Sequence, residues 1–313
     1  MIKSLSLPKI SIVTPSFNQG QFLEATIQSI LTQNYPNLEY IIIDGGSTDS
    51  SIEIIKKYEK YLHYWCSEED DGHYDGINKG LSHATGEIMA WLNSDDLYCP
   101  WALRTVASVF SQLSEVEWLT TLKPIIWDWQ GFCLHVKTIP GYSKEGFLDG
   151  RYLPSAFREQ RIGWIQQEST FWKRSLWEKI GGYISLDFPL AGDFDLWSRF
   201  YQYSDLYGVD SPLGGFRSQH QQKSRQIKTY SQEAQQSLEK LREKLEWSPN
   251  KIRDIAFNSS LCRLPKFRGS IIKNYGYCGQ KIIRRNADSS DGFWQIRPSF
   301  FLGFPGCIDR DTI

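Results

Sequence analysis

Two adjacent carboxylates, Asp95 and Asp96, follow a short apolar run at Glu87–Leu92. A run of this length, bounded by a glycine and a polar turn, predicts a buried strand. Two carboxylates at the end of a buried strand are costly unless a positive group meets them. Such oxygen ligands suit a hard divalent cation, Mg²⁺ or Mn²⁺, held together with a substrate's phosphates. In the alternative, the pair forms a solvated turn, and one carboxylate caps a helix that begins near Pro100.

Two further acids stand where chemistry is feasible. Asp44 ends the apolar run Leu38–Asp44 and is followed by Gly45 and Gly46, so a carboxylate lies beside flexible backbone that suits a ribose or base. Asp193 lies at the start of an expected helix. It is interpreted either as a residue that caps this helix or as a general base presented on a rigid helix end.

The elements that position these residues alternate along the chain. Apolar runs at Lys9–Pro15, Leu38–Asp44, Leu62–Cys66 and Glu87–Leu92 predict strands, and Gln21–Gln33 and Asp75–His83 predict helices between them. This alternation predicts an α/β fold with a mostly parallel, doubly wound sheet flanked by helices. Because the carboxyl ends of parallel strands meet at one edge, the acids at 44, 95 and 96 are expected there together.

The second half of the chain predicts a different arrangement. Trp118–Trp129 and Cys133–Ile139 are typical of an antiparallel hairpin, and Ser231–Trp247 has the composition of a helix. Residues 255–287 contain no Asp or Glu but carry seven Lys and Arg residues, namely Arg263, Lys266, Arg268, Lys273, Lys281, Arg284 and Arg285. This stretch is either a solvated surface or a patch for an anionic lipid headgroup or a lipid-linked diphosphate.

Composition excludes several classes of protein. The 313 residues carry a net charge of −1, which gives no strong field for nucleic acid, so no nucleic-acid partner is expected. The six cysteines form no CxxC pair, which argues against a zinc site or a disulfide framework. The N-terminus has no long apolar run of a signal peptide, and no stretch is apolar enough to span a membrane. A cytoplasmic location is expected, with peripheral contact at the inner face of the cell membrane.

Four motifs occur in order between residues 9 and 225. They are ISIVTPSFNQGQFLEATIQSILTQNYPNLEYIIIDGGSTDSS, HYDGINKGLSHATGEIMAWLNSDD, QQESTFWKRSLWEKIGGY and AGDFDLWSR. Together they resemble family 2 glycosyltransferases of the GT-A fold, and most of all the bacterial branch that builds surface polysaccharide and O-antigen units. The resemblance implies a catalytic domain over residues 1–225. Residues 226–313 lie outside it and are expected to form a mainly helical C-terminal extension with a basic, aromatic tail.

The resemblance implies a reaction and a role for each matching residue. It implies inverting transfer of a sugar from a nucleotide-diphosphate donor to a hydroxyl of a saccharide or lipid-linked acceptor, with a divalent cation on the diphosphate. The implied nucleotide contacts are Thr14, Pro15, Asn18, Asp44, Asp75, Asn78, Lys79 and Asp95; the implied metal ligands are Asp96 and His220. Asp193 is the implied general base, with Asp195 as the fallback, and Trp164, Gln167 and Glu168 are expected near the donor sugar or the acceptor.

The sequence departs from the family pattern at three positions. One is Gln166, which stands near a position that is often His. Gly45 stands where many members have a second acid, and Asn93 replaces the first acid of the DxD motif. Two other functions are compatible with the elements alone. A sugar nucleotidyltransferase is disfavoured because the loop after the first strand, PSFNQGQF, contains no basic residue. A non-catalytic carbohydrate- or nucleotide-binding protein is disfavoured because the acids at 44, 95, 96 and 193 are present together.

Overall fold

The computed structural model describes residues 7–154, 162–219, 226–258, 265–288 and 292–302. The N-terminal part alternates strands and helices, as expected. The strands are β1 (Ile10–Ser16), β2 (Leu38–Asp44), β3 (Tyr64–Ser67) and β4 (Ile88–Trp91), and the helices are α1 (Gly20–Leu31), α2 (Ser51–Tyr58) and α3 (His73–His83). β1 is buried over its whole length, which explains why it is a continuous apolar run rather than an alternating one.

Within the described residues, nine strands form one sheet in the order β13-β12-β10-β6-β9-β4-β1-β2-β3. The later strands are β6 (Trp118–Thr121), β9 (Phe171–Lys173), β10 (Tyr207–Val209), β12 (Tyr277–Arg285) and β13 (Phe293–Phe301). β9 runs antiparallel to both β4 and β6, and β13 runs antiparallel to β12, whereas all other neighbours are parallel. The predicted α/β class with a mostly parallel sheet is therefore confirmed.

A smaller sheet has the order β5-β11-β7-β8. Its strands are β5 (Leu97–Tyr98), β7 (Ile125–Trp127), β8 (Cys133–Val136) and β11 (Gly214–Arg217). β7 and β8 form the expected antiparallel hairpin, but the run Trp118–Trp129 is not one strand. It divides between β6 in the large sheet and β7 in the small sheet, and Pro124, which has no backbone N–H to donate, lies at the division.

The middle of the chain adds short helices around the large sheet. They are α4 (Ala102–Gln112), α5 (Lys144–Leu148), α6 (Arg174–Lys179) and α7 (Gly192–Phe200), and a short 3₁₀ helix, η2, spans Gln167–Ser169. Among the described residues, no helix combines the length and the apolar character needed to cross a membrane.

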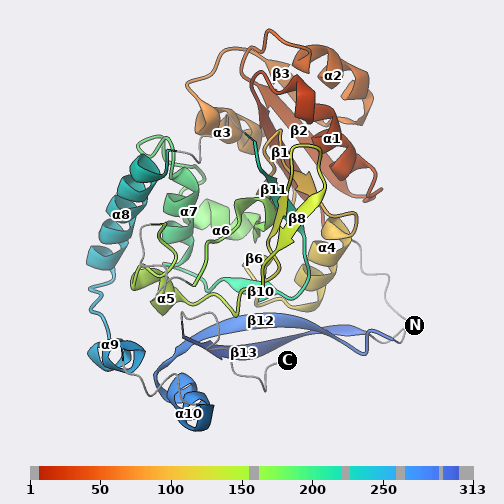
Figure 1. Ribbon diagram of the computed structural model, residues 1–313. Coiled ribbons are helices and arrows are strands. Elements are labelled where there is room, and N and C mark those ends of the chain that lie inside the picture. Colours follow the sequence, from red (N-terminus) through yellow and green to blue (C-terminus); the bar gives the residue numbers. More distant parts are fainter. Residues whose placement is uncertain (1–6, 155–161, 220–225, 259–264, 289–291, 303–313) are drawn as a thin grey trace.

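The C-terminal region is built into the same body. Its helices are α8 (Ile227–Lys244), α9 (Lys251–Asn258) and α10 (Pro265–Tyr275). Figure 1 shows α8 alongside α7, and the long β12–β13 hairpin along one end of the molecule. β12 pairs in parallel with β10, with Gly208 opposite Lys281. The expected extension thus contributes two strands to the central sheet in addition to its helices.

Candidate active site

A cavity of about 780 Å³ opens at the carboxyl ends of β1, β2 and β4. The loops after these strands, the start of α3, η2, the start of α7, β11 and α8 all contribute to its lining. The lining includes Pro15, Gly45, Gly46, Asp70, His73, Tyr74, Asn93, Asp95, Asp96, Gln167, Glu168, Asp193, Gln219 and Tyr230. The cavity lies at the sheet edge where ligands bind in open α/β folds.

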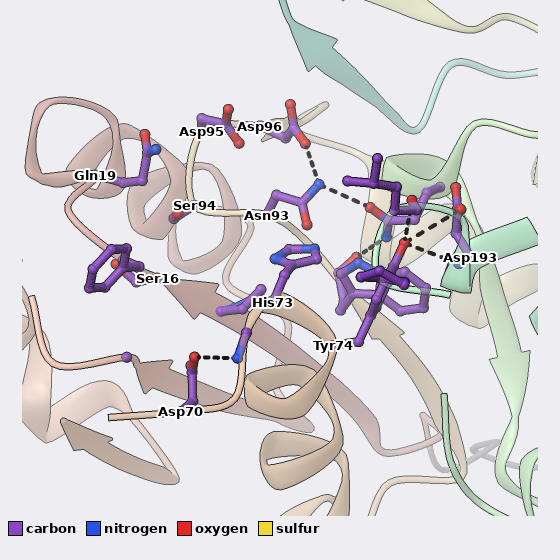
Figure 2. A pocket seen from close by; sticks show the side chains of 18 of the residues that line it. Ser16, Gln19, Asp70, His73, Tyr74, Asn93, Ser94, Asp95, Asp96 and Asp193 are labelled. Carbon is purple, nitrogen blue, oxygen red and sulfur yellow. Dashed lines mark hydrogen bonds between the residues drawn. The ribbon is translucent and has the colours of Figure 1, made fainter. Parts of the chain in front are cut away.

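Asp95 and Asp96 project from the turn after β4 (Figure 2). The Thr26 hydroxyl of α1 donates to the carbonyls of Ser94 and Asp96 at 2.8 and 2.9 Å, which fixes this turn. The helix-cap alternative is wrong, because α4 begins at Ala102, its N-cap residue is Trp101, and its Leu103 amide donates to the Gln33 side chain at 2.9 Å. The pair is therefore free of that structural task and lines the cavity instead.

Asp96 is 1 % exposed. Its Oδ1 accepts a hydrogen bond from the Arg217 amide at 2.8 Å, and its Oδ2 accepts one from the Asn93 amide at 3.0 Å. Burial raises the pKa of Asp96 well above its usual range, and the neighbouring Asp95 and Glu168 raise it further. Burial also raises the pKa of Asp95, whose Oδ2 accepts a hydrogen bond from Gln219. The structure thus concentrates acidic side chains at this edge.

The oxygen atoms around Asp96 suit a hard cation. The Asn93 Oδ1 is buried and has no hydrogen-bond partner, and no Lys or Arg lines the cavity in the described part of the chain. Over the same residues, no three His, Cys, Asp or Glu side chains are close enough to hold a metal ion by themselves. Mg²⁺ is commonly bound by one or two carboxylates together with substrate phosphates and water, so the available oxygens fit such a site. His220, the other expected ligand, lies outside the described residues.

Asp193 lies across the cavity, at the start of α7 (Figure 2). Its Oδ1 accepts hydrogen bonds from the Phe194 amide at 2.8 Å and from the Tyr230 hydroxyl at 3.1 Å. The N-cap position is held by Ala191, so Asp193 is not the N-cap residue. Burial raises the pKa of Asp193 to about 6, although the hydrogen bonds from Phe194, Tyr230 and Tyr74 oppose this rise.

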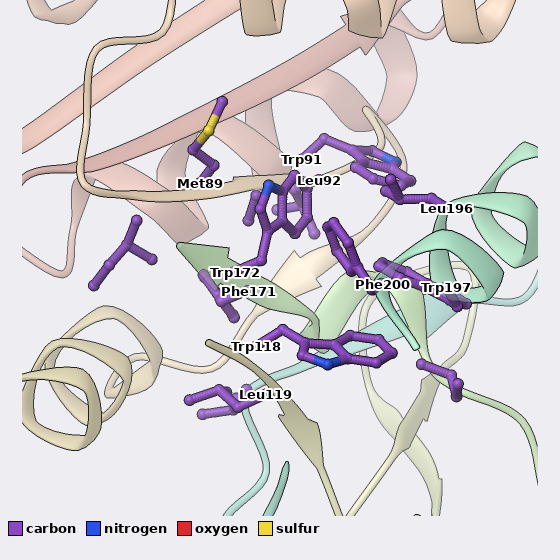
Figure 3. Close-up of a cluster of buried hydrophobic side chains, with 14 of the residues drawn as sticks. Met89, Trp91, Leu92, Trp118, Leu119, Phe171, Trp172, Leu196, Trp197 and Phe200 are labelled. Atoms are coloured by element: carbon purple, nitrogen blue, oxygen red, sulfur yellow. The ribbon is translucent and has the colours of Figure 1, made fainter. Parts of the chain in front are cut away.

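An aromatic core fixes α7, and therefore Asp193, over the sheet. The Trp197 ring of α7 stacks on Trp118 of β6 and Trp91 of β4, with centroid separations of 5.5 and 6.1 Å (Figure 3). Phe200 packs edge-on against Trp118 at 5.2 Å. Buried aromatic side chains supply a large part of the packing energy of a core, so this helix is rigidly placed.

Glu168 and Gln167 of η2 also line the cavity, and Glu168 is close enough to both Asp95 and Asp193 to interact with their charges. The Gln167 amide donates to the Trp91 carbonyl at 2.7 Å, and its Oε1 accepts a hydrogen bond from Asn93 at 3.3 Å. Burial raises the pKa of Glu168 to about 8, and Asp193 and Asp95 add to this rise. Glu168 is therefore mainly neutral at pH 7 in the absence of a cation.

Asp44 and Asn18 shape the loops rather than line the cavity. The buried Asp44 carboxylate accepts hydrogen bonds from the Ser47 amide and hydroxyl and from the Ser67 hydroxyl, at 2.6 to 2.8 Å. The Asn18 backbone N–H donates to the Ser47 hydroxyl at 2.7 Å, and the Asn18 side-chain Oδ1 accepts from the Thr48 backbone amide at 2.9 Å. These bonds join the loops after β1 and β2, and place Gly45 and Gly46 at the cavity.

Pro15 lines the cavity, but the preceding Thr14 does not. The Thr14 side chain is buried inside the sheet and accepts a hydrogen bond from the Tyr40 hydroxyl at 3.1 Å. Side chains alternate between the two faces of a strand, which separates these two neighbours.

Three expected residues of α3 also lie outside the cavity lining. Asp75 forms an ion pair with Lys79 at 3.1 Å, one turn apart on the helix. The Asn78 amide exchanges two hydrogen bonds of 2.8 Å with the backbone of Ile184, which ties α3 to the segment before α7.

Asp195 and Trp164 have other partners. The Asp195 carboxylate pairs with Arg199 at 2.9 Å and accepts a hydrogen bond from the Ser237 hydroxyl of α8 at 3.0 Å. The Trp164 ring lies 4.2 Å from the Lys137 ammonium group. Neither residue is part of the cavity lining.

Sequence reasoning missed Asp70, Tyr74 and Tyr230, which all line the cavity. The Asp70 carboxylate lies 2.8 Å from the position that a Cβ on Gly45 would occupy, so it fills the space beside Asp44 that a second acid would take. The acidic stretch at 68–71 was the available signal for Asp70. Nothing in the sequence pointed to Tyr230, because it follows the last motif.

Comparisons with known proteins agree with this arrangement. Residues 11–120 match the sequence profile of the family described as Glycosyl transferase family 2. An uncharacterized glycosyltransferase of Mycobacterium tuberculosis is 33 % identical over 196 residues, which cover 60 % of this chain and 67 % of that protein. The putative teichuronic acid biosynthesis glycosyltransferase TuaG of Bacillus subtilis is 40 % identical over 92 residues, 28 % of this chain and 36 % of TuaG.

Solved structures share the fold at low sequence identity. Residues 1–349 of TarS from S. aureus, in complex with UDP-GlcNAc, have a TM-score of 0.50 and 16 % identity, and the match covers 85 % of this chain and 81 % of that fragment. The mannosyltransferase PcManGT from Pyrobaculum calidifontis, in complex with GDP-Man and Mn²⁺, has a TM-score of 0.52 and 16 % identity, covering 85 % and 84 %. The fold is thus the expected GT-A type. Taken with the family profile and the mycobacterial relative, it shows that the chain belongs to glycosyl transferase family 2.

Proposed function

We propose that this glycosyltransferase moves a sugar from a nucleotide-diphosphate donor to an acceptor hydroxyl and inverts the anomeric configuration. The observation that supports this proposal is the cavity itself. It brings Asp95 and Asp96 after β4 together with Asp193 at the start of α7, and its described lining has no Lys or Arg to meet a diphosphate. Residues 1–225 would form the catalytic domain, completed by α8.

The nucleotide would bind at the loops after β1 and β2. Pro15, Gly45, Gly46 and Asp70 line this end, where the two glycines would permit close approach of a ribose or base to the backbone and the Asp70 carboxylate would offer an acceptor. Asp44 and Asn18 would act by holding these loops in place. The two solved structures were determined in complex with UDP-GlcNAc and with GDP-Man, which supports a donor of this class without selecting the sugar.

Asp96, with Asp95 and the Asn93 amide oxygen beside it, would hold Mn²⁺ or Mg²⁺ on the diphosphate. When bound, such a cation neutralises the phosphates and makes the nucleoside diphosphate a better leaving group. The cation would then offset the charges of Asp95 and Asp96 on the cavity side, together with the nearby Arg217 guanidinium.

Asp193 would act as the general base. As the acceptor oxygen bonds to the anomeric carbon, the bond to the diphosphate oxygen breaks and the hydroxyl proton passes to the Asp193 carboxylate. A pKa of about 6 leaves this carboxylate mostly ionised at pH 7 while keeping it basic enough to take a proton. A single displacement of this kind inverts the configuration.

The acceptor would be a saccharide or a lipid-linked saccharide of a bacterial surface polysaccharide. Its lipid would bring the enzyme to the membrane surface. Helix α9 exposes Ile252 and Ile255, one turn apart at 58 % and 70 %, and the exposed Lys251 precedes them. Apolar residues beside a cation are typical of a surface that touches anionic lipid. Arg263 and the side chains of Lys266 and Arg268 lie outside the described residues, and Lys281 pairs with Asp210 at 2.9 Å.

A thermal-shift screen tests the proposed donor and cation. We expect UDP- or GDP-sugars to raise the melting temperature of the wild type more strongly with Mn²⁺ than without it, because they bind only the native state. Asp96→Ala should lose the Mn²⁺-dependent part, whereas Asp193→Asn should keep it and lose turnover. No shift with any nucleotide would favour a non-catalytic binding protein.

Sedimentation with vesicles that contain anionic lipid tests the membrane surface. The double variant Ile252→Ser and Ile255→Ser should sediment less than the wild type, whereas serine at the exposed Leu186 should leave sedimentation unchanged. Equal sedimentation of all three proteins would contradict the proposed contact without affecting the proposed transfer.

A further inference from the structure

One face of helix α8 packs against the start of α7 and forms hydrogen bonds with it. Tyr230, Glu233 and Ser237 are spaced three and four residues apart, so their side chains point to the same side of the helix. Between and beyond them, Ala234, Leu238 and Leu241 are buried. All of these residues lie beyond the four motifs that carry the family resemblance.

Glu233 holds the chain where it enters α7. Its Oε2 accepts hydrogen bonds from the backbone amides of Leu190 and Ala191, at 2.9 and 2.8 Å. Amides at the start of a helix have no partner within the helix and need one from elsewhere. A residue of the C-terminal region therefore fixes the backbone two residues before Asp193.

Tyr230 reaches the Asp193 side chain directly. Its hydroxyl lies 3.1 Å from Oδ1 and 3.3 Å from Oδ2 of this carboxylate, and Tyr230 also lines the cavity. On the other side, a Cβ added to Gly192 would lie 2.7 Å from the Tyr74 ring of α3. The start of α7 is thus enclosed between a tyrosine of α3 and a tyrosine of α8.

We propose that Tyr230 is a positioning residue for sugar transfer, which holds the Asp193 carboxylate toward the acceptor site and keeps it in its ionised form. This inference rests on the proposed function, in which Asp193 is the general base. It also assigns a task in the active site to the region after residue 225.

The titratable groups around Asp193 determine how its protonation changes with pH. They are His73 and Tyr74 of α3, Glu168 of η2, Asp195 of α7, and Tyr230 and Glu233 of α8. A hydroxyl that donates to a carboxylate favours the charged form, so its removal raises the pKa of Asp193 further. By linkage, this rise in pKa makes the Tyr230→Phe variant less stable than the wild type above pH 6. It adds no difference in stability at a pH where Asp193 is protonated in the native state of both proteins.

The first experiment needs no substrate. Melting temperatures of the wild type, Tyr230→Phe and Ala234→Gly are compared at pH 5 and pH 8. We expect Tyr230→Phe to lower the melting temperature more at pH 8 than at pH 5. Ala234→Gly weakens the same interface without contacting a titratable group, so it should lower the melting temperature by the same amount at both pH values. An equal loss in Tyr230→Phe at the two pH values would overturn the inference.

The second experiment measures release of the nucleoside diphosphate from UDP-GlcNAc and GDP-mannose with Mn²⁺. For Tyr230→Phe we expect kcat to fall by about 10-fold or more with little change in KM, since one hydrogen bond to a charged group is lost. The acidic limb of its pH profile should move up by about one unit. Ala234→Gly should keep the wild-type limb.

Asp193→Asn distinguishes a failure of the role proposed for Tyr230 from a failure of the proposed general base. If it is inactive while Tyr230→Phe keeps the wild-type kcat and pH limb, the inference fails and the proposed base stands. If Asp193→Asn turns over at the wild-type rate, the proposed base fails, and with it the task assigned to Tyr230. The melting comparison at pH 5 and pH 8 still tests independently whether the Tyr230 hydroxyl stabilises the ionised Asp193 carboxylate.

Discussion

At the scale of residues, the cavity holds carboxylates in different states of protonation. Burial raises the pKa of Asp193 to about 6 and that of Glu168 to about 8, and Glu168 also faces Asp193 and Asp95, which add to its rise. Environments that separate the pKa values of neighbouring acids are typical of sites that transfer protons.

The pH dependence of turnover tests the state of Asp193. A base acts only when deprotonated, so kcat/KM should fall about 10-fold per pH unit below pH 6 and level off above it. The measurement is the pH profile with a donor found in the thermal-shift screen. A profile that stays level down to pH 4.5 would contradict Asp193 as the base.

Glu168 offers a test without turnover. Its native pKa of about 8 lies above the value in an unfolded chain, so its contribution to stability is lost as pH rises from about 4 to 8. Glu168→Gln should therefore gain in melting temperature relative to the wild type at pH 9 compared with pH 5. A difference between the two proteins that is constant with pH would refute this expectation.

Asp96 combines a cost for folding with a proposed function. Asp96→Asn should raise the melting temperature of the ligand-free protein at pH 7 by about 2–4 °C, because it removes the cost of burying a carboxylate beside Asp95. The same variant should lose the shift produced by Mn²⁺ with a nucleotide sugar. If the ligand-free variant melts below the wild type, the Asn93 and Arg217 amides outweigh this cost.

At the scale of elements, close helix–strand contact carries the loops of the site. α3 approaches β1 at Gly80, where an added Cβ would lie 2.3 Å from the Val13 side chain. This contact sets the depth of α3 and therefore the place of His73 and Tyr74 at its start. Helix α3 can therefore pack this closely on β1 only because residue 80 is a glycine.

Gly80→Ala should lower the free energy of unfolding by about 1–3 kcal/mol, because a buried methyl group forces α3 away from the sheet. Gly269→Ala on α10 is the matched control, since an added Cβ meets nothing within 4 Å there. The control should be neutral or slightly stabilising in chemical denaturation, as alanine favours a helix over glycine. Equal effects of the two substitutions would contradict the proposed packing.

At the scale of the whole molecule, the sheet and the site both depend on the C-terminal region. β12 and β13 extend the sheet beyond β10, and α8 supplies Tyr230 to the cavity. Residues on either side of position 225 therefore share one hydrophobic core, which includes Leu238, Leu241 and Ile282.

A chain that ends at residue 225 should fail to fold cooperatively. It would expose the face of α7 that packs on α8 and the edge of β10 that pairs with β12. Denaturation followed by circular dichroism, with the full chain as reference, checks this. A cooperative transition at the midpoint of the full chain would show that the N-terminal part is an independent domain.

The sequence by itself determined the alternation of strands and helices and the sheet edge at which the strand before Asp95 and Asp96 and the strand that ends at Asp44 meet. These features follow from local periodicity and from the rule that parallel strands end on one side. Motif resemblance placed Asp193, Gln167 and Glu168, which the structure brings to the same cavity.

Only the tertiary structure decided which acids face the cavity and what surrounds them. Asp44 and Asp195 are saturated by neighbouring hydroxyls and an arginine, whereas Asp70 and Tyr230 come to the site from segments with no matching motif. Side-chain direction and pairings between distant segments, such as β10 with β12, depend on the packing of the complete core. Local sequence patterns do not carry that information, because the competing arrangements differ only in long-range contacts.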